Sequence, residues 1–155
     1  MIVKNKSDLS FILNLQKIAF KSEAIKYSDF QMPPLTQTKE EIGEEFDNET
    51  IFFKYLKNNE IVGSVRANIK DNICYIKRLV VHPDYQKQGI GKFLMNELEG
   101  YFSDKCTAFE LFTGEKSEST IKMYEKLGYK IFDKRKVGAY FIVYMRKSKE
   151  HKKPL

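Results

Sequence analysis

A short turn with two glycines, residues 86–91, separates an apolar run that ends at Val81 from a stretch of helical periodicity. Gly89 and Gly91 have no Cβ, so the backbone there takes left-handed angles freely and approaches a ligand closely. The first amides of a helix have no intrahelical acceptor, and they lie at the positive end of the helix dipole. The pattern therefore predicts a strand, a tight turn and a helix whose N-terminus binds a pyrophosphate.

The residues before the turn have the period of β-strands. Strands are predicted at residues 51–56, 61–69 and 73–81, each rich in β-branched and aromatic side chains. The dipeptides Asn58-Asn59 and Asp71-Asn72 separate them and favour tight turns between antiparallel neighbours.

The residues after the turn alternate between helix and strand patterns. The first helix carries a single apolar stripe, formed by Ile90, Phe93, Leu94, Leu98, Tyr101 and Phe102. A strand is predicted at 108–112, followed by a helix that Ser117 or Ser119 caps and Gly128 ends. Two closing strands follow, at residues 131–132 and 139–145.

The N-terminal part has weaker signals. A short first strand is predicted at residues 2–4, and Ser7 is expected to cap the first helix. Residues 21–37 have no clear period and are predicted to be irregular, whereas Thr38 is expected to cap a second helix with acids in its first turn. The element order indicates a mixed α/β domain with a partly antiparallel sheet.

Length and charge limit the possible classes of protein. The chain has 155 residues, 42% of them apolar, which suits one compact domain with its own core. We assign this domain to residues 1–147 and a basic C-terminal tail to 148–155. The net charge is +6, and we interpret the tail as a solvated end rather than a nucleic-acid arm. The positive charges at this end are Arg146, Lys147, Lys149, Lys152 and Lys153.

Cysteine usage and hydropathy indicate the compartment. Cys74 and Cys106 are far apart with no second pair, so neither a disulfide framework nor a metal site is predicted. Residues 1–8 lack the apolar stretch of a secretory signal. No run approaches the roughly 18 apolar residues that span a membrane. We therefore expect a soluble, cytoplasmic protein without membrane or nucleic-acid partners.

The glycine turn differs from two common phosphate-binding motifs. No Gly-Lys-Ser/Thr follows it, as in a P-loop, and the first glycine of the dinucleotide fingerprint is absent. Residues 79–91 instead resemble the central motif of the GNAT superfamily of N-acetyltransferases, Arg/Gln-x-x-Gly-x-Gly/Ala after an apolar strand. Gln86, Gly89 and Gly91 occupy the first, fourth and sixth positions of that motif.

The resemblance extends to a second motif and covers nearly the whole chain. Residues 117–129 are similar to the family's motif in which Tyr-Glu-Lys-Leu-Gly-Phe/Tyr closes a helix, and Tyr124 is its tyrosine. The resemblance implies a single-domain α/β GNAT fold. Its mixed, mostly antiparallel sheet has about six to seven strands with about four flanking helices, and it is splayed between the fourth and fifth strands.

The resemblance also implies an acetyl-CoA-dependent N-acetyltransferase that needs no metal. The pantetheine arm pairs with the strand before the turn like an added strand, and the acceptor amine attacks the thioester directly in a ternary complex. Tyr124 is then the general acid at the leaving thiolate. The residues implied to bind acetyl-CoA are Leu79, Val80, Val81, Gln86, Lys87, Gln88, Gly89, Ile90, Gly91, Lys92 and Ser117.

The sequence departs from the family pattern at two points. Ser117 stands where the second motif often begins with Asn, and we interpret it mainly as a helix cap. The strand at 73–79 lacks the acid that often acts as general base. Three candidates for the general base therefore stay open at this point: water, Tyr75, or an acid such as Glu110. Tyr124 also has an alternative role as a core residue on the apolar face of its helix.

The acceptor is predicted to be a primary amine of a small molecule or peptide. The family's acceptor site lies near its first helices, which would place Tyr27, Phe30, Pro34 and the acids of residues 40–45 near the acceptor. The alternatives are a protein lysine or N-terminal acetyltransferase and a catalytically silent CoA-binding sensor. A nucleic-acid binder is the weakest alternative, and a homodimer is compatible with the sequence.

Overall fold

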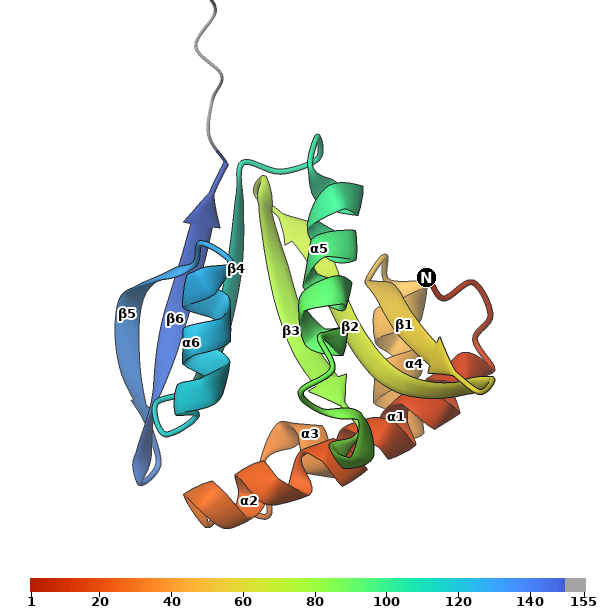
Figure 1. The fold of residues 1–155 in the computed structure, drawn as a ribbon, viewed down its shortest axis with the longest axis horizontal. Coiled ribbons are helices and arrows are strands. Elements are labelled where there is room, and N and C mark those ends of the chain that lie inside the picture. The colour runs from red at the N-terminus through yellow and green to blue at the C-terminus, as the bar shows by residue number, and fades with distance from the viewer. Residues whose placement is uncertain (150–155) are drawn as a thin grey trace, which may run out of the picture.

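The computed structural model describes residues 1–149, which form one six-stranded sheet with helices on both faces (Figure 1). The helices are α1 (Asp8–Ala19), α2 (Lys21–Tyr27), α3 (Pro33–Thr36), α4 (Lys39–Asp47), α5 (Ile90–Phe102) and α6 (Glu118–Lys126), with a 3-10 turn η1 (Pro83–Tyr85). The strands are β1 (Ile51–Lys57), β2 (Glu60–Lys70), β3 (Ile73–Val81), β4 (Ala108–Gly114), β5 (Lys130–Val137) and β6 (Tyr140–Ser148). Their spatial order is β1-β2-β3-β4-β6-β5.

The sheet is mixed and mostly antiparallel, as predicted. β3 and β4 run parallel, and the other neighbouring pairs run antiparallel. The two predicted hairpin turns have the expected geometry, because Asn58, Asn59, Asp71 and Asn72 all have positive φ angles. Two successive left-handed residues match the twist of antiparallel strands, and asparagine and aspartate tolerate them best.

β3 and β4 separate along most of their length, and this splay is the main irregularity of the sheet. Their pairing is confined to three residues of each strand, Ile73 to Tyr75 against Ala108 to Glu110. Beyond these pairs the β3 edge that faces β4 has no strand partner within residues 1–149. Figure 1 shows the two ribbons diverging toward α2 and α3. The splay lies where it was predicted, between the strand before the glycine turn and the next strand.

The N-terminal part differs from the prediction in three places, the first being Ser7, whose side chain makes no capping hydrogen bond to α1. Residues 2–4 form only an isolated bridge from Ile2 to Phe53, because α1 begins before a longer pairing can form. Residues 21–37, predicted to be irregular, contain α2 and α3. Both helices are too short for a clear apolar period, and Pro33 occupies the first turn of α3, where its missing amide is not needed. The described part of the chain therefore has six α-helices rather than about four.

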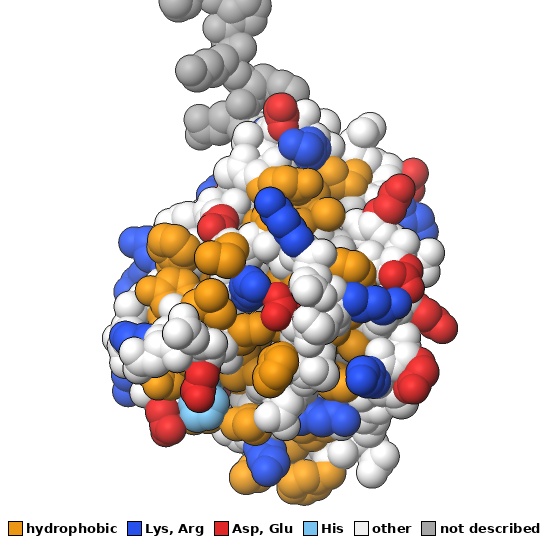
Figure 2. Space-filling model, turned by 90° about the vertical axis from the view of Figure 1, so that its right-hand side faces the viewer, with side chains coloured by type: hydrophobic (Ala, Val, Ile, Leu, Met, Phe, Trp, Pro, Cys, Tyr) orange, Lys and Arg blue, Asp and Glu red, His pale blue; other side chains and the backbone are white. Residues whose placement is uncertain are grey.

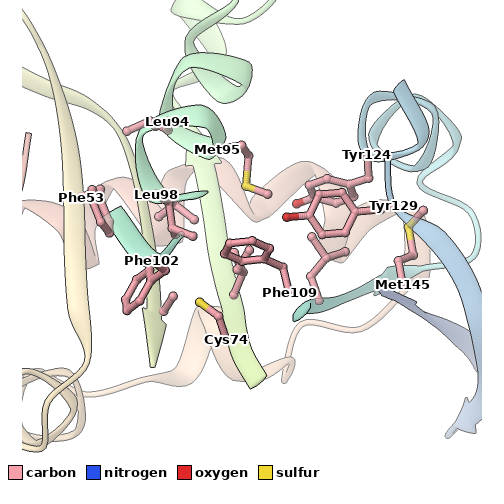
Figure 3. Packing of buried hydrophobic residues seen from close by; sticks show 14 of the residues in the cluster. Phe53, Cys74, Leu94, Met95, Leu98, Phe102, Phe109, Tyr124, Tyr129 and Met145 are labelled. Carbon is pink, nitrogen blue, oxygen red and sulfur yellow. The ribbon is translucent and has the colours of Figure 1, made fainter. Parts of the chain in front are cut away.

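The larger core lies between the sheet and the pair α5 and α6, while α1 and α4 pack on the other face (Figure 1). Figure 3 shows Leu94, Met95 and Leu98 of α5 directed into this core, and none of them is exposed. Each such side chain contributes about 1.5–3 kcal/mol through burial. Gly63 of β2 allows the close approach of α5, because a Cβ there would lie 2.8 Å from Ile90 Cγ2. Core packing thus fixes the position of the glycine turn.

The C-terminal strand extends further than predicted. The charges of Arg146 and Lys147 were interpreted as belonging to a solvated end of the chain, but β6 runs through both residues and includes Ser148, the first residue of the assigned tail. Arg146 Nε donates to Glu110 at 2.8 Å, and Lys147 Nζ donates to Glu99 at 2.7 Å. These carboxylates come from β4 and α5, so the sequence near the C-terminus alone could not reveal them. The remainder of the predicted tail, residues 150–155, lies outside the described residues.

The face beside β1 carries acidic and basic side chains interspersed with hydrophobic ones (Figure 2). Positive charge is therefore not gathered into one patch on this face. Among residues 1–149, no helix has both the length and the apolar composition needed to cross a membrane.

Candidate active site

The glycine turn has the geometry that its sequence predicts. Gly89 has a φ of +81° and Lys87 a φ of +62°, so the turn contains two left-handed residues. α5 begins at Ile90, and the amides of residues 87–92 have no backbone acceptor in the described part of the chain. Several donors are thus available at the positive end of the α5 dipole, which is the arrangement that binds phosphate groups.

A β-bulge in β3 lies shortly before the turn. The register of β2 and β3 shifts between Ser64 and Arg66, and Arg78 has a φ of +58°. A bulge bends its strand and changes the direction of the side chains. It separates the part of β3 that pairs with β4 from residues 79–81, whose edge toward β4 is unpaired.

A cavity of about 740 Å³ lies between the separated parts of β3 and β4. Its wall is formed by residues 76–81 of β3, residues 111–114 of β4, the glycine turn and parts of α2, α3 and α6. All the predicted cofactor-binding residues except Gln88 line this cavity, and so does Tyr124. The fold therefore brings together the two motifs that are separated in the sequence.

Two glutamines of the turn have structural contacts. Gln88 is not part of the cavity wall, and its Oε1 accepts a hydrogen bond from Lys57 Nζ at 3.0 Å. Gln86 lines the cavity and its Nε2 donates to the carbonyl oxygen of Val81 at 3.3 Å. Gln86 thus ties the end of β3 to the turn.

Tyr124 belongs both to the core and to the cavity wall. Its side chain is 6% exposed, and its ring lies 5.8 Å from that of Tyr129 between centroids. Figure 3 shows both hydroxyl groups pointing toward the α5 side of the core. Burial raises the pKa of Tyr124, so its hydroxyl stays protonated and acts as a hydrogen-bond donor.

Ser117 has a different role from the predicted one. It stands at the N-cap position of α6, but its side chain makes no capping hydrogen bond. Its Oγ instead donates to Glu23 Oε2 at 2.8 Å and lies 2.9 Å from Tyr27 Oη. Since the serine proton goes to Glu23, the tyrosine donates to Ser117. Ser117 is 2% exposed, and its partners come from α2, which no local pattern around Ser117 could indicate.

The two side chains proposed from the sequence as the general base do not lie at the cavity. Neither Tyr75 nor Glu110 lines the cavity, and Glu110 is paired with Arg146. Among the described residues that form the wall, Glu23 is the only carboxylate. Glu23 was missed because α2 was not recognised as a helix.

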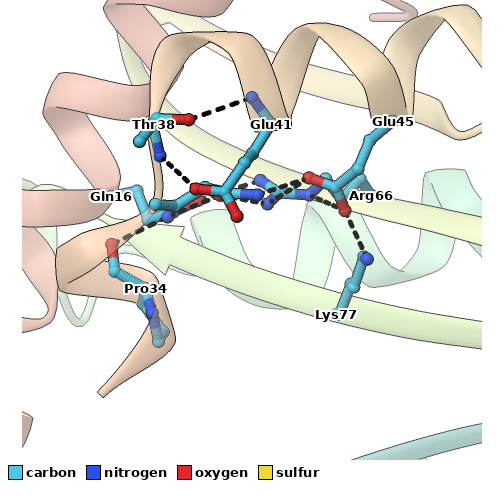
Figure 4. A network of polar contacts seen from close by, with 8 residues as sticks. Gln16, Pro34, Thr38, Glu41, Glu45, Arg66 and Lys77 are labelled. Carbon is cyan, nitrogen blue, oxygen red and sulfur yellow. Dashed lines mark hydrogen bonds and ion pairs between the residues drawn. The ribbon is translucent and has the colours of Figure 1, made fainter. Parts of the chain in front are cut away.

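The acceptor-side residues predicted from the sequence are partly brought together. Tyr27 and Pro34 line the cavity, whereas Phe30 does not and is 63% exposed. Of the acids in residues 40–45, Glu45 is held in a network with Arg66 and Lys77 (Figure 4). Burial raises the pKa of Glu45, but Arg66 and Lys77 outweigh it and lower the pKa below its ordinary value.

A smaller hollow of about 370 Å³ adjoins the glycine turn between α5 and α6. Lys92, Lys122 and Lys126 contribute to its wall. Lys122 and Lys126 are four residues apart and so share one face of α6, a signal that was readable in the sequence. Within residues 1–149, no group of three or more His, Cys, Asp or Glu side chains is placed to hold a metal ion.

Comparisons with known proteins agree with this architecture. Residues 13–129 match the family model described as the acetyltransferase (GNAT) family. The catalytic subunit NAA20 of the N-terminal acetyltransferase B complex from Arabidopsis thaliana is 36% identical over 83 residues, 52% of this chain and 47% of that protein. The chain spans about half the length of the curated relatives it matches.

Two solved structures share the fold. The paiA N-acetyltransferase from Thermoplasma acidophilum, in complex with coenzyme A, superposes with a TM-score of 0.78 and 21% identity, covering 96% of this chain and 98% of that one. An aminoglycoside 6′-N-acetyltransferase complexed with coenzyme A gives a TM-score of 0.72 and 20% identity, covering 96% of each chain. These likenesses show the fold of the chain.

Proposed function

Because this chain belongs to the acetyltransferase (GNAT) family, we propose that it transfers the acetyl group of acetyl-CoA to a primary amine of a small molecule or peptide. The observation that carries the proposal is the cavity of about 740 Å³. The glycine turn, the unpaired edge of β3 and Tyr124 all line it, so donor and acceptor meet inside the splay.

Acetyl-CoA is held by backbone groups in this proposal. The pyrophosphate accepts hydrogen bonds from the amides of residues 87–92, beside the charges of Lys87 and Lys92. The pantetheine arm pairs with residues 79–81 of β3 and takes the place that β4 leaves empty. The lysine-lined hollow next to the turn receives the phosphate on the ribose of CoA.

The reaction is a direct displacement at the thioester. The acceptor nitrogen attacks the carbonyl carbon, a C–N bond forms, the C–S bond breaks, and CoA leaves as its thiolate. Tyr124 donates a hydrogen bond to the sulfur, because its raised pKa favours donation without loss of the proton. Glu23 receives the proton of the attacking amine, directly or through one water, since it is the carboxylate of the described cavity wall.

Acetylation of a protein N-terminus is the second candidate. It is favoured by the relative from Arabidopsis thaliana, which is named as the catalytic subunit of an N-terminal acetyltransferase complex. The two candidates share the donor site and differ in the acceptor, so a peptide tested beside small amines separates them.

The experiment combines binding with turnover. Acetyl-CoA is titrated calorimetrically into the protein, and release of free thiol is then followed with polyamines, aminoglycosides, amino acids and peptides. We expect binding, with thiol release for one acceptor class. Absence of binding at saturating acetyl-CoA rejects the donor assignment. Binding without thiol release for any amine favours a catalytically silent CoA-binding sensor.

A further inference from the structure

Among the described cations of the cavity wall, Arg78 has neither an ion-pair partner nor a part in the proposed reaction, whereas Lys26 and Lys77 pair with Glu23 and Glu45 and Lys87 and Lys92 belong to the phosphate site. Arg78 lies in the β3 bulge, directly before the strand residues assigned to pantetheine, and it is one of the residues that line the cavity. Its Nε is buried and has no hydrogen-bond partner within the described residues. No carboxylate of residues 1–149 lies within ion-pair distance of its guanidinium, in contrast to Arg66.

The neighbouring charges are already engaged with one another. Arg66 Nη2 donates to Glu45 Oε2 at 2.9 Å and to Gln37 Oε1 at 2.8 Å, and Lys77 pairs with the other oxygen of Glu45 (Figure 4). Glu45 thus has both oxygens occupied. Arg66, Lys77 and Arg78 together bring three positive charges against this single carboxylate.

The electrostatic balance is unfavourable for Arg78 without a further anion. Burial lowers the pKa of Arg78, and Glu45 offsets this only in part. Burial also lowers the pKa of Arg66 to about 10, and the charge of Arg78 contributes to that decrease. A guanidinium nitrogen that is buried without a partner is costly, and a carboxylate is the group that matches the guanidinium geometry best.

We propose that Arg78 binds a carboxylate of the acceptor, so that the acceptor carries both an amine and a carboxylate. This inference rests on the proposed function, because the same cavity holds the thioester. Arg78, Glu23 and residues 79–81 line the same cavity, so one acceptor can present its carboxylate to Arg78 and its amine to the thioester. An α-amino acid, or a peptide with an acidic side chain close to its N-terminus, has this arrangement of groups.

The rest of the cavity wall suits the body of such an acceptor. Phe20, Met32, Pro34 and Tyr140 provide apolar and aromatic surface on the side of α1 to α3. We assign Glu23 to the amine of the acceptor and Arg78 to its carboxylate, while Lys26 lies beside Glu23 and pairs with its other oxygen.

The test measures binding of reaction products, so it does not depend on turnover. Three probes are titrated into the protein with and without CoA: N-acetyl-L-leucine, its carboxamide, and an N-acetylated Leu-Asp dipeptide amide. We expect at least one carboxylate probe to bind about tenfold or more tightly than the carboxamide. The amino acid tests an α-carboxylate and the dipeptide tests a side-chain carboxylate. Equal affinity of all three probes, or no binding by any of them, overturns the inference.

Variants of Arg78 test whether this residue causes the preference for carboxylate probes. In Arg78→Gln the carboxylate preference should fall to within about twofold, and in Arg78→Lys it should be intermediate, because lysine keeps the charge but not the planar fork. Arg135→Gln is the control, since Arg135 is an exposed arginine paired with Asp133 outside the cavity. A preference that survives in Arg78→Gln overturns the assignment.

Acetyl-CoA is titrated into the same variants. In the wild-type protein, acetyl-CoA binding without any carboxylate preference refutes the role of Arg78 alone, whereas absence of acetyl-CoA binding refutes the proposed function itself. If Arg78→Gln weakens acetyl-CoA and leaves the carboxylate probes unchanged, Arg78 serves the donor and the inference fails.

Discussion

The hydroxyl oxygens of Tyr27 and Ser117 lie 2.9 Å apart, although 90 residues separate them in the chain. Their contact links α2 to the start of α6 between the separated strands β3 and β4. The Ser117 hydroxyl in turn donates a hydrogen bond to Glu23 Oε2. Gly114 of β4 makes this approach possible, because a Cβ at that position would overlap the phenol of Tyr27. The contact therefore holds the only carboxylate of the described cavity wall in place.

Ser117→Ala should lower turnover by roughly tenfold or more, because Glu23 loses the donor that orients it. The variant should also lose about 1–3 kcal/mol of stability, since Tyr27 is left with an unpaired hydroxyl. Thiol-release kinetics and chemical denaturation measure the two effects. Ser103→Ala, at the exposed end of α5, is the control. Full turnover in Ser117→Ala would show that Ser117 is not needed to orient Glu23 for the reaction.

Gly89→Val should abolish the rise in melting temperature that acetyl-CoA produces, because a β-branched residue is strained at a φ of +81° and the turn changes shape. The strain should cost the free protein roughly 1–2 kcal/mol. Gly100→Ala in α5 is the matched control, since nothing lies within 4 Å of a Cβ there and its φ is not positive. That control should gain up to about 1 kcal/mol and keep the ligand-induced shift. An unchanged shift in Gly89→Val would argue against the turn as the phosphate site.

Tyr124→Phe should reduce kcat by on the order of 10–100-fold while acetyl-CoA affinity stays nearly constant, because the hydroxyl is needed only when the thiolate leaves. Burial raises the pKa of Tyr124, so the ratio of wild-type to variant rates should stay constant from pH 7 to about pH 10, the ordinary tyrosine pKa. Steady-state kinetics across this range provide the measurement.

Tyr129→Phe is the control for that variant. Tyr129 shares the same core but lies outside the cavity wall, and its hydroxyl donates to Glu99 at 3.0 Å. This control should lose stability and retain kcat. Equal kcat for wild type and Tyr124→Phe would remove the assigned role of Tyr124.

Glu45→Gln should destabilise the fold by roughly 3 kcal/mol at neutral pH, because it leaves Arg66 buried without its anion. The folded-state pKa of Glu45 lies below its ordinary value of 4.5, so its contribution to stability is complete above about pH 4.5. It is lost as the pH falls through the folded-state pKa.

Thermal melts between pH 3 and pH 7 check this prediction. The difference between wild type and Glu45→Gln should shrink as the solution becomes more acidic. Glu44→Gln, an exposed neighbour on α4, should melt like the wild type at each pH. A difference that does not depend on pH would show that the charge of Glu45 is not what stabilises the network.

Structural elements that depend on interactions between neighbouring residues could be predicted from the sequence, and those that depend on tertiary packing could not. The turns at Asn58-Asn59 and Asp71-Asn72, the capping box between Thr38 and Glu41, and the stripe of α5 depend on neighbours within a few residues. These elements were therefore predictable. α2 and α3 are stable only because they pack against the rest of the fold, and helices of this length have no strong signal of their own.

The candidate site likewise has one part that the sequence predicted and one part that depends on the tertiary structure. Residues 86–91 carry their own signal, because the glycines and the first amides of α5 act together over one turn of chain. The positions of Glu23, Ser117 and Arg78 relative to the cavity depend on how α2, α6 and the β3 bulge meet. The resemblance of residues 117–129 pointed to the correct helix, but Ser117, interpreted mainly as a helix cap, makes a buried hydrogen bond to Glu23 instead.

The sequence by itself determined the glycine turn, the alternation of strands and helices around it, and the family to which the chain belongs. Only the tertiary structure decided which charges face the cavity and which are already paired, as the contrast between Arg66 and Arg78 shows. The physical reason is that periodicity and turn chemistry act over a few neighbouring residues. The balance of a buried charge depends instead on partners that the fold brings from distant parts of the chain.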